Sequence, residues 1–231
     1  MRRRLASVIL APGAAVVAVM LTVSTAFAAP STWAMSPGGS YSSTLASTTA
    51  PLTDTTASQS FTCKAETDAG TFHASASGSP AVLAAVTSSR FGTCTDSLGD
   101  TDWSATSSGT WDINGYHYEG ADGTGTTCPD TGVTCGTITN VTIKYSGKLL
   151  GAACDFTVAG SLGTSSEPGS ASDLPVTYNN STGELFVPST PTLKVTSVTG
   201  CEGIIKVGDA AEFTGTFLIS PKQIITGSPA S

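Results

Sequence analysis

Apolar residues alternate with polar residues in many short segments of this chain, and this alternation limits what the chain can fold into. The clearest case is the segment in which Phe213, Gly215, Phe217 and Ile219 occupy every second position. A period of two places successive side chains on opposite faces of a strand. Ser and Thr together account for 68 of the 231 residues, a composition that favours short strands and turns over long helices.

Gly, Asn and Pro interrupt the alternating segments at short intervals, as the turns between antiparallel strands require. A parallel sheet needs long connecting helices, but the only segments with helical character are short, at residues 81–85 and 204–207. The sequence therefore predicts an all-β fold, either an antiparallel β-sandwich or a barrel-like sheet with disulfides.

Two segments predict specific turns. Asn114-Gly115 is typical of a two-residue type I′ turn, because both residues tolerate a positive φ. The hairpin made by that turn would place Asp112 opposite His117 on its polar face. Residues 179–183, with the sequence Asn-Asn-Ser-Thr-Gly, predict a second turn between two apolar segments.

The first 28 residues have the pattern of a secretory signal peptide. Three arginines precede an apolar segment over residues 5–23, and small residues flank a cleavage site at Ala28. We expect a signal helix that is removed after export, and an uncleaved membrane anchor is the alternative because the segment nearly reaches the length of a membrane span. Residues 29–58 are expected to form a Ser/Thr/Pro-rich arm or edge strand, and residues 59–231 a single β domain.

The charge of the chain narrows the set of partners. The chain carries ten basic and seventeen acidic side chains, and cleavage after residue 28 would remove three basic ones and none of the acidic ones. The mature protein would therefore have a formal charge of −10. Nucleic acids and anionic membranes bind clustered Lys and Arg, so neither is an expected partner after signal cleavage. We expect a secreted protein, extracellular or at the cell surface.

Six cysteines in an exported chain indicate disulfide bonds. Fifteen pairings are possible, and we predict the sequential one, namely Cys63 with Cys94, Cys128 with Cys135, and Cys154 with Cys201. Only the predicted bridge between Cys128 and Cys135 is supported by the local sequence, because these cysteines bracket a turn sequence at residues 129–132. A zinc site is disfavoured, since no Cys-x-x-Cys pair occurs and neither histidine lies at ligand spacing to a cysteine.

The predicted hairpin would bring Asp112, His117 and Glu119 together, and these are the candidate residues for binding or for general acid-base chemistry. A charge pair on a solvated strand face is the alternative interpretation. A nucleophile and an oxyanion donor cannot be identified, and no Gly-x-Ser-x-Gly motif occurs. We therefore assign no catalytic residue and no cofactor, and we expect a protein that is not an enzyme.

A short acidic segment contains Asp96, Asp100 and Asp102 and is followed by Trp103. Oxygen-rich loops of this kind bind calcium outside cells, but the spacing lacks the twelve-residue calcium-loop pattern, so a solvated acidic turn is the alternative. No other metal site is expected. Trp103 is the tryptophan expected to be exposed, and it is therefore a candidate contact for a ligand.

Several of these motifs resemble a family of proteins. The segments Phe91-Gly92-Thr93-Cys94, residues 178–183, Gly200-Cys201-Glu202-Gly203 and residues 221–225 are similar to those of uncharacterised small secreted β-rich proteins of actinobacteria. The resemblance implies export and a β-rich fold, and it implies no activity. Four of the cysteines match that pattern, whereas Cys128 and Cys135 look like an added local bridge.

These observations favour a secreted, disulfide-bonded β protein that acts by binding, or as a structural component, at the cell surface or in the extracellular space. Its expected partner is a cell-wall or other extracellular polymer. Two alternatives remain open. One is an extracellular hydrolase that uses the candidate residues of the predicted hairpin, and the other is a carrier of a small apolar ligand, which requires a cavity of several hundred cubic ångströms, as an order of magnitude.

Overall fold

The computed structural model of the chain describes residues 30–118, 120–121, 127–128, 132–160 and 173–229. Within these residues the chain consists of β-strands joined by turns, with one 3-10 turn at Cys201–Gly203. The predicted all-β class is confirmed. The helical segments expected from the sequence are wrong, because residues 81–85 lie in a long strand and residues 204–207 form turns. The expected signal peptide lies outside the described residues.

The described residues form seventeen strands, numbered in chain order. Their bounds are β1 (Pro30–Ser36), β2 (Gly39–Leu45), β3 (Ala50–Asp54), β4 (Gln59–Phe72), β5 (Ser75–Ser77), β6 (Ala81–Asp96), β7 (Trp103–Ser107), β8 (Trp111–Tyr118), β9 (Gly120–Ala121), β10 (Thr127–Cys128), β11 (Val133–Thr139), β12 (Thr142–Leu149), β13 (Ala152–Gly160), β14 (Leu174–Asn179), β15 (Glu184–Gly200), β16 (Ala210–Ser220) and β17 (Ile224–Pro229).

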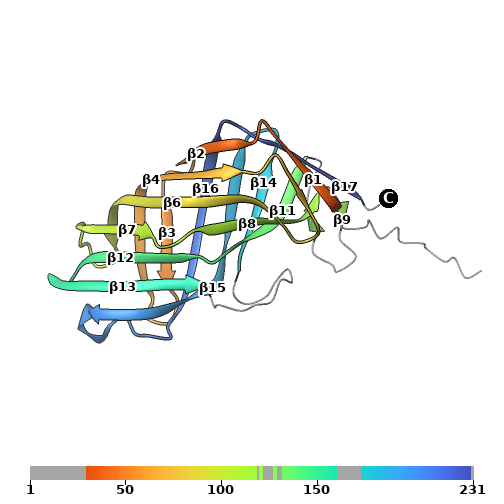
Figure 1. The fold of residues 1–231 in the computed structure, drawn as a ribbon. Coiled ribbons are helices and arrows are strands. Elements are labelled where there is room, and N and C mark those ends of the chain that lie inside the picture. Colours follow the sequence, from red (N-terminus) through yellow and green to blue (C-terminus); the bar gives the residue numbers. More distant parts are fainter. Residues whose placement is uncertain (1–29, 119, 122–126, 129–131, 161–172, 230–231) are drawn as a thin grey trace, which may run out of the picture.

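Twelve of these strands form one antiparallel sheet that closes on itself (Figure 1). Four long strands, β4, β6, β15 and β16, each occupy one position in the sheet. Each of the other four positions is occupied by two shorter strands that lie one after the other. The pairs are β2 with β3, β7 with β8, β11 with β12, and β13 with β14. The sheet thus has eight strand positions in chain order, and the circuit closes where β16 pairs with β2 and β3.

The closed sheet encloses a core that is rich in aromatic side chains. Phe61 on β4 lies 4.8 Å from the ring of Trp103 on β7 and 4.9 Å from that of Phe156 on β13. Tyr145 stacks on Phe156 with a centroid separation of 4.9 Å. Such tilted and stacked contacts are the favoured arrangements of aromatic rings. The interior is therefore filled by side chains from strands on opposite sides of the circuit.

All three predicted disulfides are confirmed. Cys63 and Cys94 lie opposite each other on β4 and β6, and both are buried. Cys154 on β13 is bonded to Cys201 in the 3-10 turn, so this bridge links the end of β15 to the strand that already pairs with it. Cys128 and Cys135 form the short third bridge. Alternation along the strands places Cys63, Cys94 and Cys154 on the inner face, and Cys201 in the 3-10 turn is buried as well.

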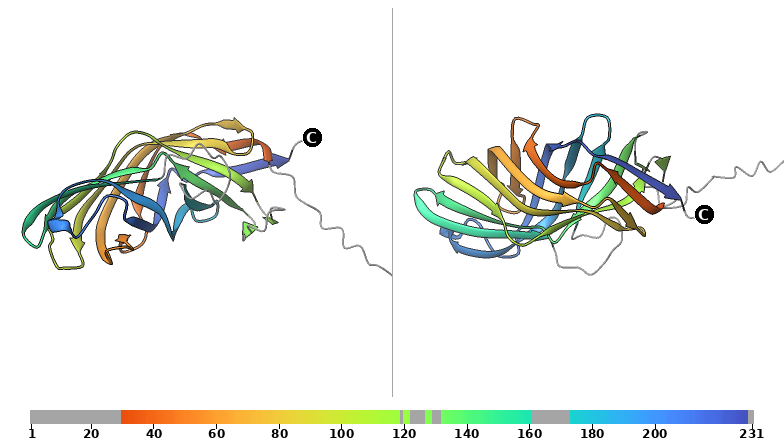
Figure 2. Two further views of the ribbon diagram at one scale, coloured as in Figure 1. Left: turned by 90° about the horizontal axis from the view of Figure 1, so that it is seen from below. Right: turned by 45° about the horizontal axis from the view of Figure 1, so that its top comes forward.

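The segment expected to be an arm or an edge strand, residues 29–58, contributes three strands instead. β2 and β3 both pair with β4 on one side and with β16 on the other. β1 pairs with β17 and β5 in a small separate sheet at the end of the molecule that carries the C-terminus (Figures 1 and 2). Trp33 and Tyr41 hold this segment against the rest of the protein, because both side chains are buried.

The hairpin predicted at Asn114-Gly115 does not form, because β8 runs straight through both residues. β8 pairs with β6 on one side and with β11 on the other. A Cβ atom on Gly115 would lie 2.6 Å from Leu83 Cδ1, so the glycine allows close packing and does not serve a turn. The Asn114 amide donates to Thr139 Oγ1 on β11 at 3.0 Å. Pairing on both edges thus overrides the local turn preference.

The second predicted turn is confirmed. It connects β14 to β15, and Asn179 lies opposite Glu184 in the resulting hairpin. Gly183 adopts a positive φ of 76°, and Asn179 Oδ1 accepts a hydrogen bond from the Ser181 N–H at 2.8 Å. This is the Asx-type bonding that makes asparagine common in turns.

Candidate functional site

A row of hydroxyl and basic side chains crosses the outer face of six neighbouring strands, β4, β6, β7, β12, β13 and β15. Residues directly opposite each other on adjacent strands point to the same face, so the strand registers define the row. It consists, in order, of Thr67, Arg90, Thr106, Lys144, Thr157 and Ser197. We call this set the transverse row. With strands about 4.8 Å apart, it spans roughly 24 Å.

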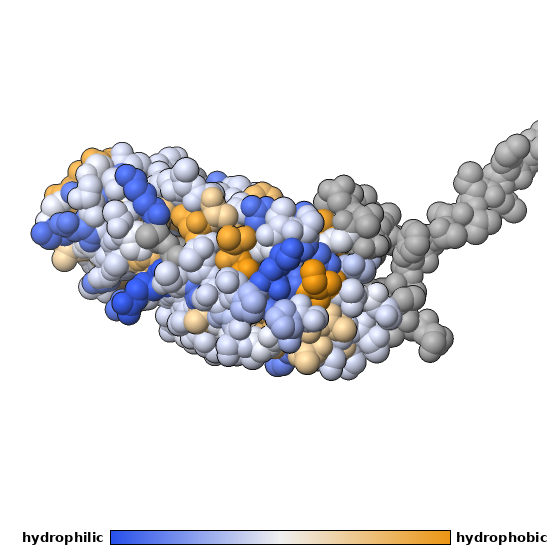
Figure 3. All heavy atoms as spheres, turned by 90° about the horizontal axis from the view of Figure 1, so that it is seen from above, coloured by the Kyte–Doolittle hydropathy of each residue, from blue (hydrophilic) through white to orange (hydrophobic). Residues whose placement is uncertain are grey.

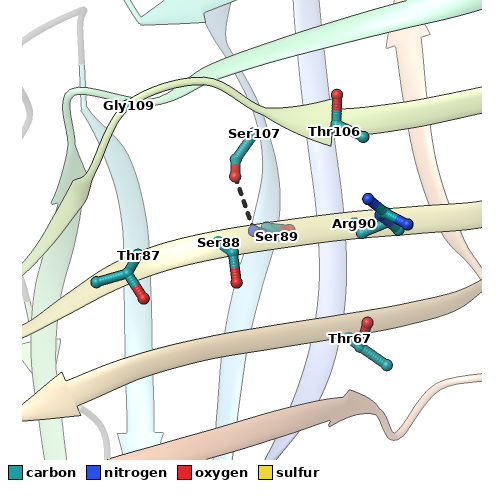
Figure 4. Close-up of a pocket in the computed structure, with 8 residues that line it drawn as sticks. All are labelled: Thr67, Thr87, Ser88, Ser89, Arg90, Thr106, Ser107 and Gly109. Carbon is teal, nitrogen blue, oxygen red and sulfur yellow. Dashed lines mark hydrogen bonds between the residues drawn. The ribbon is translucent and has the colours of Figure 1, made fainter.

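One end of the transverse row lies in a hollow of about 470 Å³ on the surface of β4, β6 and β7. Figure 4 shows Thr67, Arg90 and Thr106 on three successive strands of this hollow. The backbone N–H of Ser89 donates to Ser107 Oγ at 2.7 Å, which fixes the hydroxyl at its edge. The lining consists of six hydroxyl side chains, one arginine and one glycine, namely Thr67, Thr87, Ser88, Ser89, Arg90, Thr106, Ser107 and Gly109.

The other end of the row lies in a second hollow, of about 310 Å³, on β12, β13 and β15. Its lining includes Lys144, Thr157 and Ser197 of the transverse row, together with Asp155 and Thr199. Thr106 lies directly opposite Lys144, so the row is continuous from the first hollow to the second. The two hollows therefore belong to one polar strip across the sheet.

The chemistry of the strip is that of a hydrogen-bonding surface. Arg90 is exposed, and it is the only arginine after residue 28. Its guanidinium offers five N–H donors in a planar arrangement, whereas each Ser or Thr hydroxyl both donates and accepts. Arg90 and Lys144 lie two strands apart, about 10 Å, with the Thr106 hydroxyl between them. Such a surface suits an extended ligand that carries many hydroxyl groups.

The candidate residues of the predicted hairpin are not brought together. Asp112 and His117 are five positions apart along the continuous strand β8, a separation of about 16 Å. Asp112 instead accepts a hydrogen bond from the Asn140 side chain at 3.0 Å. Glu119 lies outside the described residues. The structure therefore provides no shared site for Asp112 and His117.

The acidic segment after β6 is a turn organised by one carboxylate. Asp96 Oδ1 accepts the backbone N–H groups of Leu98 and Asp100, both at 2.9 Å. Asp100 Oδ2 accepts the N–H of Leu150 at 2.6 Å, and Asp102 is exposed. In the described part of the chain, no three His, Cys, Asp or Glu side chains gather around a point that could hold a metal ion.

Trp103 was expected to be exposed, but it is buried, with 2% of its surface accessible. Its indole N–H donates to Asp96 Oδ2 at 3.2 Å, and its ring packs edge-on against Phe61. A Cβ atom on Gly147 would lie 2.5 Å from the ring, so the glycine makes room for the indole. Trp103 is part of the core and cannot serve as a surface contact for a ligand.

A pair of buried carboxyl groups occurs where β3 meets the start of β16. Asp54 is 1% exposed and lies beside Asp209, which is also buried. Burial raises the pKa of Asp54, and the charge of Asp209 raises it further. The N–H groups of Thr56 and Ala57 donate to Asp54 Oδ1 at 3.0 and 2.8 Å and oppose that rise. Elsewhere, burial raises the pKa of the Tyr178 hydroxyl.

The outer surface carries apolar side chains in small patches. On the face in Figure 3, these patches are separated by hydrophilic side chains and by pale areas of intermediate hydropathy. Phe186 on β15 and Leu218 on β16, each 43% exposed, are among the exposed apolar residues. Apolar atoms make up more than half of an ordinary protein surface, so small patches of this kind need no functional explanation. The polar strip is therefore the better basis for a functional interpretation.

The comparisons leave the function to be argued from the site itself. No protein-family model matches the chain, and neither a curated protein nor a solved structure matches it. Among the described residues, there is no helix with the length and apolar character that a membrane crossing needs.

The transverse row could not be identified from the sequence. Alternation does indicate that Lys144 faces outward, because Ile143 and Tyr145 on either side are buried. The alignment of Lys144 with Arg90, however, depends on the registers of β6 with β7 and of β7 with β12. Those registers are set by contacts between separate strands and leave no local signal.

Proposed function

We propose that this protein is secreted and binds an extracellular polysaccharide through the transverse row. The observation that carries the proposal is the continuous line of hydroxyl and basic side chains across six strands. Three disulfides support a location outside the cytosol, because such bonds persist in oxidising compartments. The resemblance to small secreted β proteins of actinobacteria is part of the same proposal.

A polysaccharide matches the strip in both chemistry and length. Sugar hydroxyls donate and accept hydrogen bonds, as the Ser and Thr side chains of the row do. A strip of roughly 24 Å exceeds the size of one sugar ring and suits a polymer chain. Arg90 and Lys144 can each bind a ring oxygen or an isolated carboxylate. The formal charge of −10 that the mature protein would carry opposes a densely anionic polymer, so the ligand is a neutral or sparsely carboxylated polysaccharide.

Variants of the row test this function. The purified protein is expected to be retarded in gels that contain a cell-wall polysaccharide fraction or a soluble neutral glucan. Arg90→Ala should weaken binding about tenfold, because a hydrogen bond to a charged donor contributes roughly 1.5 kcal/mol. Thr106→Val removes a hydroxyl with little change in shape and should weaken binding about fivefold, since a neutral hydrogen bond contributes about 1 kcal/mol.

Lys194→Ala is the matched control, because Lys194 is exposed on β15 but lies outside the transverse row. This variant should bind as the unaltered protein does. The proposal fails if none of the polysaccharides retards the unaltered protein, or if Lys194→Ala weakens binding as much as Arg90→Ala does.

A further inference from the structure

A small cavity lies inside the closed sheet, separate from the transverse row. Its volume is about 30 Å³, which is room for roughly two water molecules. All eight strand positions of the circuit contribute to its wall, so it lies on the axis of the sheet. This volume is far below the several hundred cubic ångströms that a carrier of apolar ligands requires. Any ligand held here must be very small.

The wall of the cavity is mostly apolar and includes several aromatic rings. Tyr41, Trp111, Phe213 and Phe217 contribute rings from β2, β8 and β16. The last two of these rings are stacked, with centroids 6.1 Å apart and an angle of 8° between their planes. Ring faces carry a negative electrostatic potential and attract cations. An aromatic wall of this kind favours a positively charged occupant.

A carboxylate completes the wall. Asp68 on β4 faces the cavity, and its Oδ2 accepts a hydrogen bond from the buried Ser43 hydroxyl on β2. Asp68 Oδ1 is buried and accepts no hydrogen bond from the residues that the structure describes. An unpaired buried carboxylate oxygen is costly, by roughly 1–3 kcal/mol or more, so this oxygen favours an occupant of the cavity that pairs with it. An occupant that pairs with Asp68 Oδ1 must donate a hydrogen bond or carry a positive charge.

A second polar atom without a partner lies in the same wall. The indole N–H of Trp111 is buried and donates to no acceptor within the described part of the chain, and the whole residue is only 6% exposed. One small cation next to Asp68 and one water molecule next to that cation would fill the cavity. The water would accept the hydrogen bond that the Trp111 indole N–H donates. Both unpaired atoms would then be satisfied by a single arrangement.

We propose that this cavity is a binding site for the ammonium ion. Asp68 supplies the counter-charge and accepts an N–H hydrogen bond, and the aromatic rings stabilise the cation through their faces. The size of the cavity excludes bulky quaternary ammonium groups. Its chemistry also distinguishes ammonium from metal cations such as potassium, because only ammonium donates a hydrogen bond to Asp68 Oδ1. The negative charge of the protein draws cations toward it and repels anions.

Thermal unfolding of the unaltered mature protein tests the site without any variant. Melting curves are recorded in ammonium chloride, potassium chloride, sodium chloride and tetramethylammonium chloride at equal ionic strength. A ligand that binds only the folded state raises the melting temperature in a saturable manner. We expect this rise with ammonium alone. Equal melting temperatures in all four salts, or a rise of the same size with potassium, would overturn the proposal.

Two variants locate the binding. Asp68→Asn retains an oxygen that can accept from Ser43 but removes the charge, so ammonium affinity should fall about tenfold or more. Asp102→Asn removes an exposed carboxylate from a turn after β6 and should leave the affinity unchanged. Equal ammonium binding by Asp68→Asn and the unaltered protein would refute the site. Because the cavity and the transverse row are separate, this result would leave the polysaccharide proposal standing.

Discussion

At the residue scale, the buried carboxyl group of Asp54 has consequences for stability. Burial, followed by the nearby charge of Asp209, raises its pKa above the ordinary value of 3.8. The folded protein therefore holds this proton over a pH range in which the unfolded chain has released it. The contribution of Asp54 to stability is fully present below about pH 3.8 and is lost as the pH rises through the raised pKa.

Replacing Asp54 by asparagine should remove this pH dependence. The Asn side-chain oxygen can still accept the N–H groups of Thr56 and Ala57, and its amide can donate to Asp209. We expect Asp54→Asn to be more stable than the unaltered protein at pH 7, with a difference that shrinks toward pH 3. Urea unfolding at several pH values measures this. A variant that is less stable at pH 7 by the same amount as at pH 3 would contradict the account.

Trp111 and Trp103 show how single residues change their roles once the strands pair. Trp111 lies just before Asn114-Gly115, where a turn was predicted, and the structure buries it on a continuous strand that lines the cavity. Trp103 follows an acidic turn and was therefore expected at the surface. The structure buries it because Gly147, which is distant in the sequence but lies on the neighbouring strand β12, leaves space for its ring. Local context therefore did not determine the exposure of Trp103.

At the element scale, β8 shows why a strong local turn signal failed. Asn114-Gly115 satisfies every requirement of a tight turn, yet both residues pair with β6 and β11. Each backbone group in a doubly paired strand gains a hydrogen bond, and a hairpin would remove the pairing with one neighbour. The Asn179 to Gly183 turn forms as predicted because it joins strands that are already adjacent in the circuit.

The three disulfides should differ in their effect on stability. In the loop-entropy description, the bridge that closes 47 residues, Cys154 with Cys201, contributes about 4 kcal/mol. The bridge that closes seven residues, Cys128 with Cys135, contributes about 2.5 kcal/mol. We expect the double alanine variant of the longer bridge to lose more unfolding free energy in urea. The reverse order would show that the short bridge stabilises the folded state by another means.

At the scale of the whole molecule, the sequence predicted the class of fold but not its closure. Alternation at Phe213 and Phe217 correctly indicated a half-buried strand, and both residues face the interior. That β16 returns to pair with β2 and β3 depends on contacts between the two ends of the chain. Such contacts have no local signature in the sequence. The transverse row could not be predicted for the same reason, because it depends on the pairing of six strands.

The central claim is that an extracellular polysaccharide binds across the transverse row. The most direct measurement is a nuclear magnetic resonance titration of the isotope-labelled mature protein with an oligosaccharide of the bound polymer. We predict that amide shifts change along the row, at Arg90, Thr106, Lys144 and Thr157, and leave those near His117 unchanged. Shifts confined to β8, or absent along the row at saturating oligosaccharide, would contradict the claim.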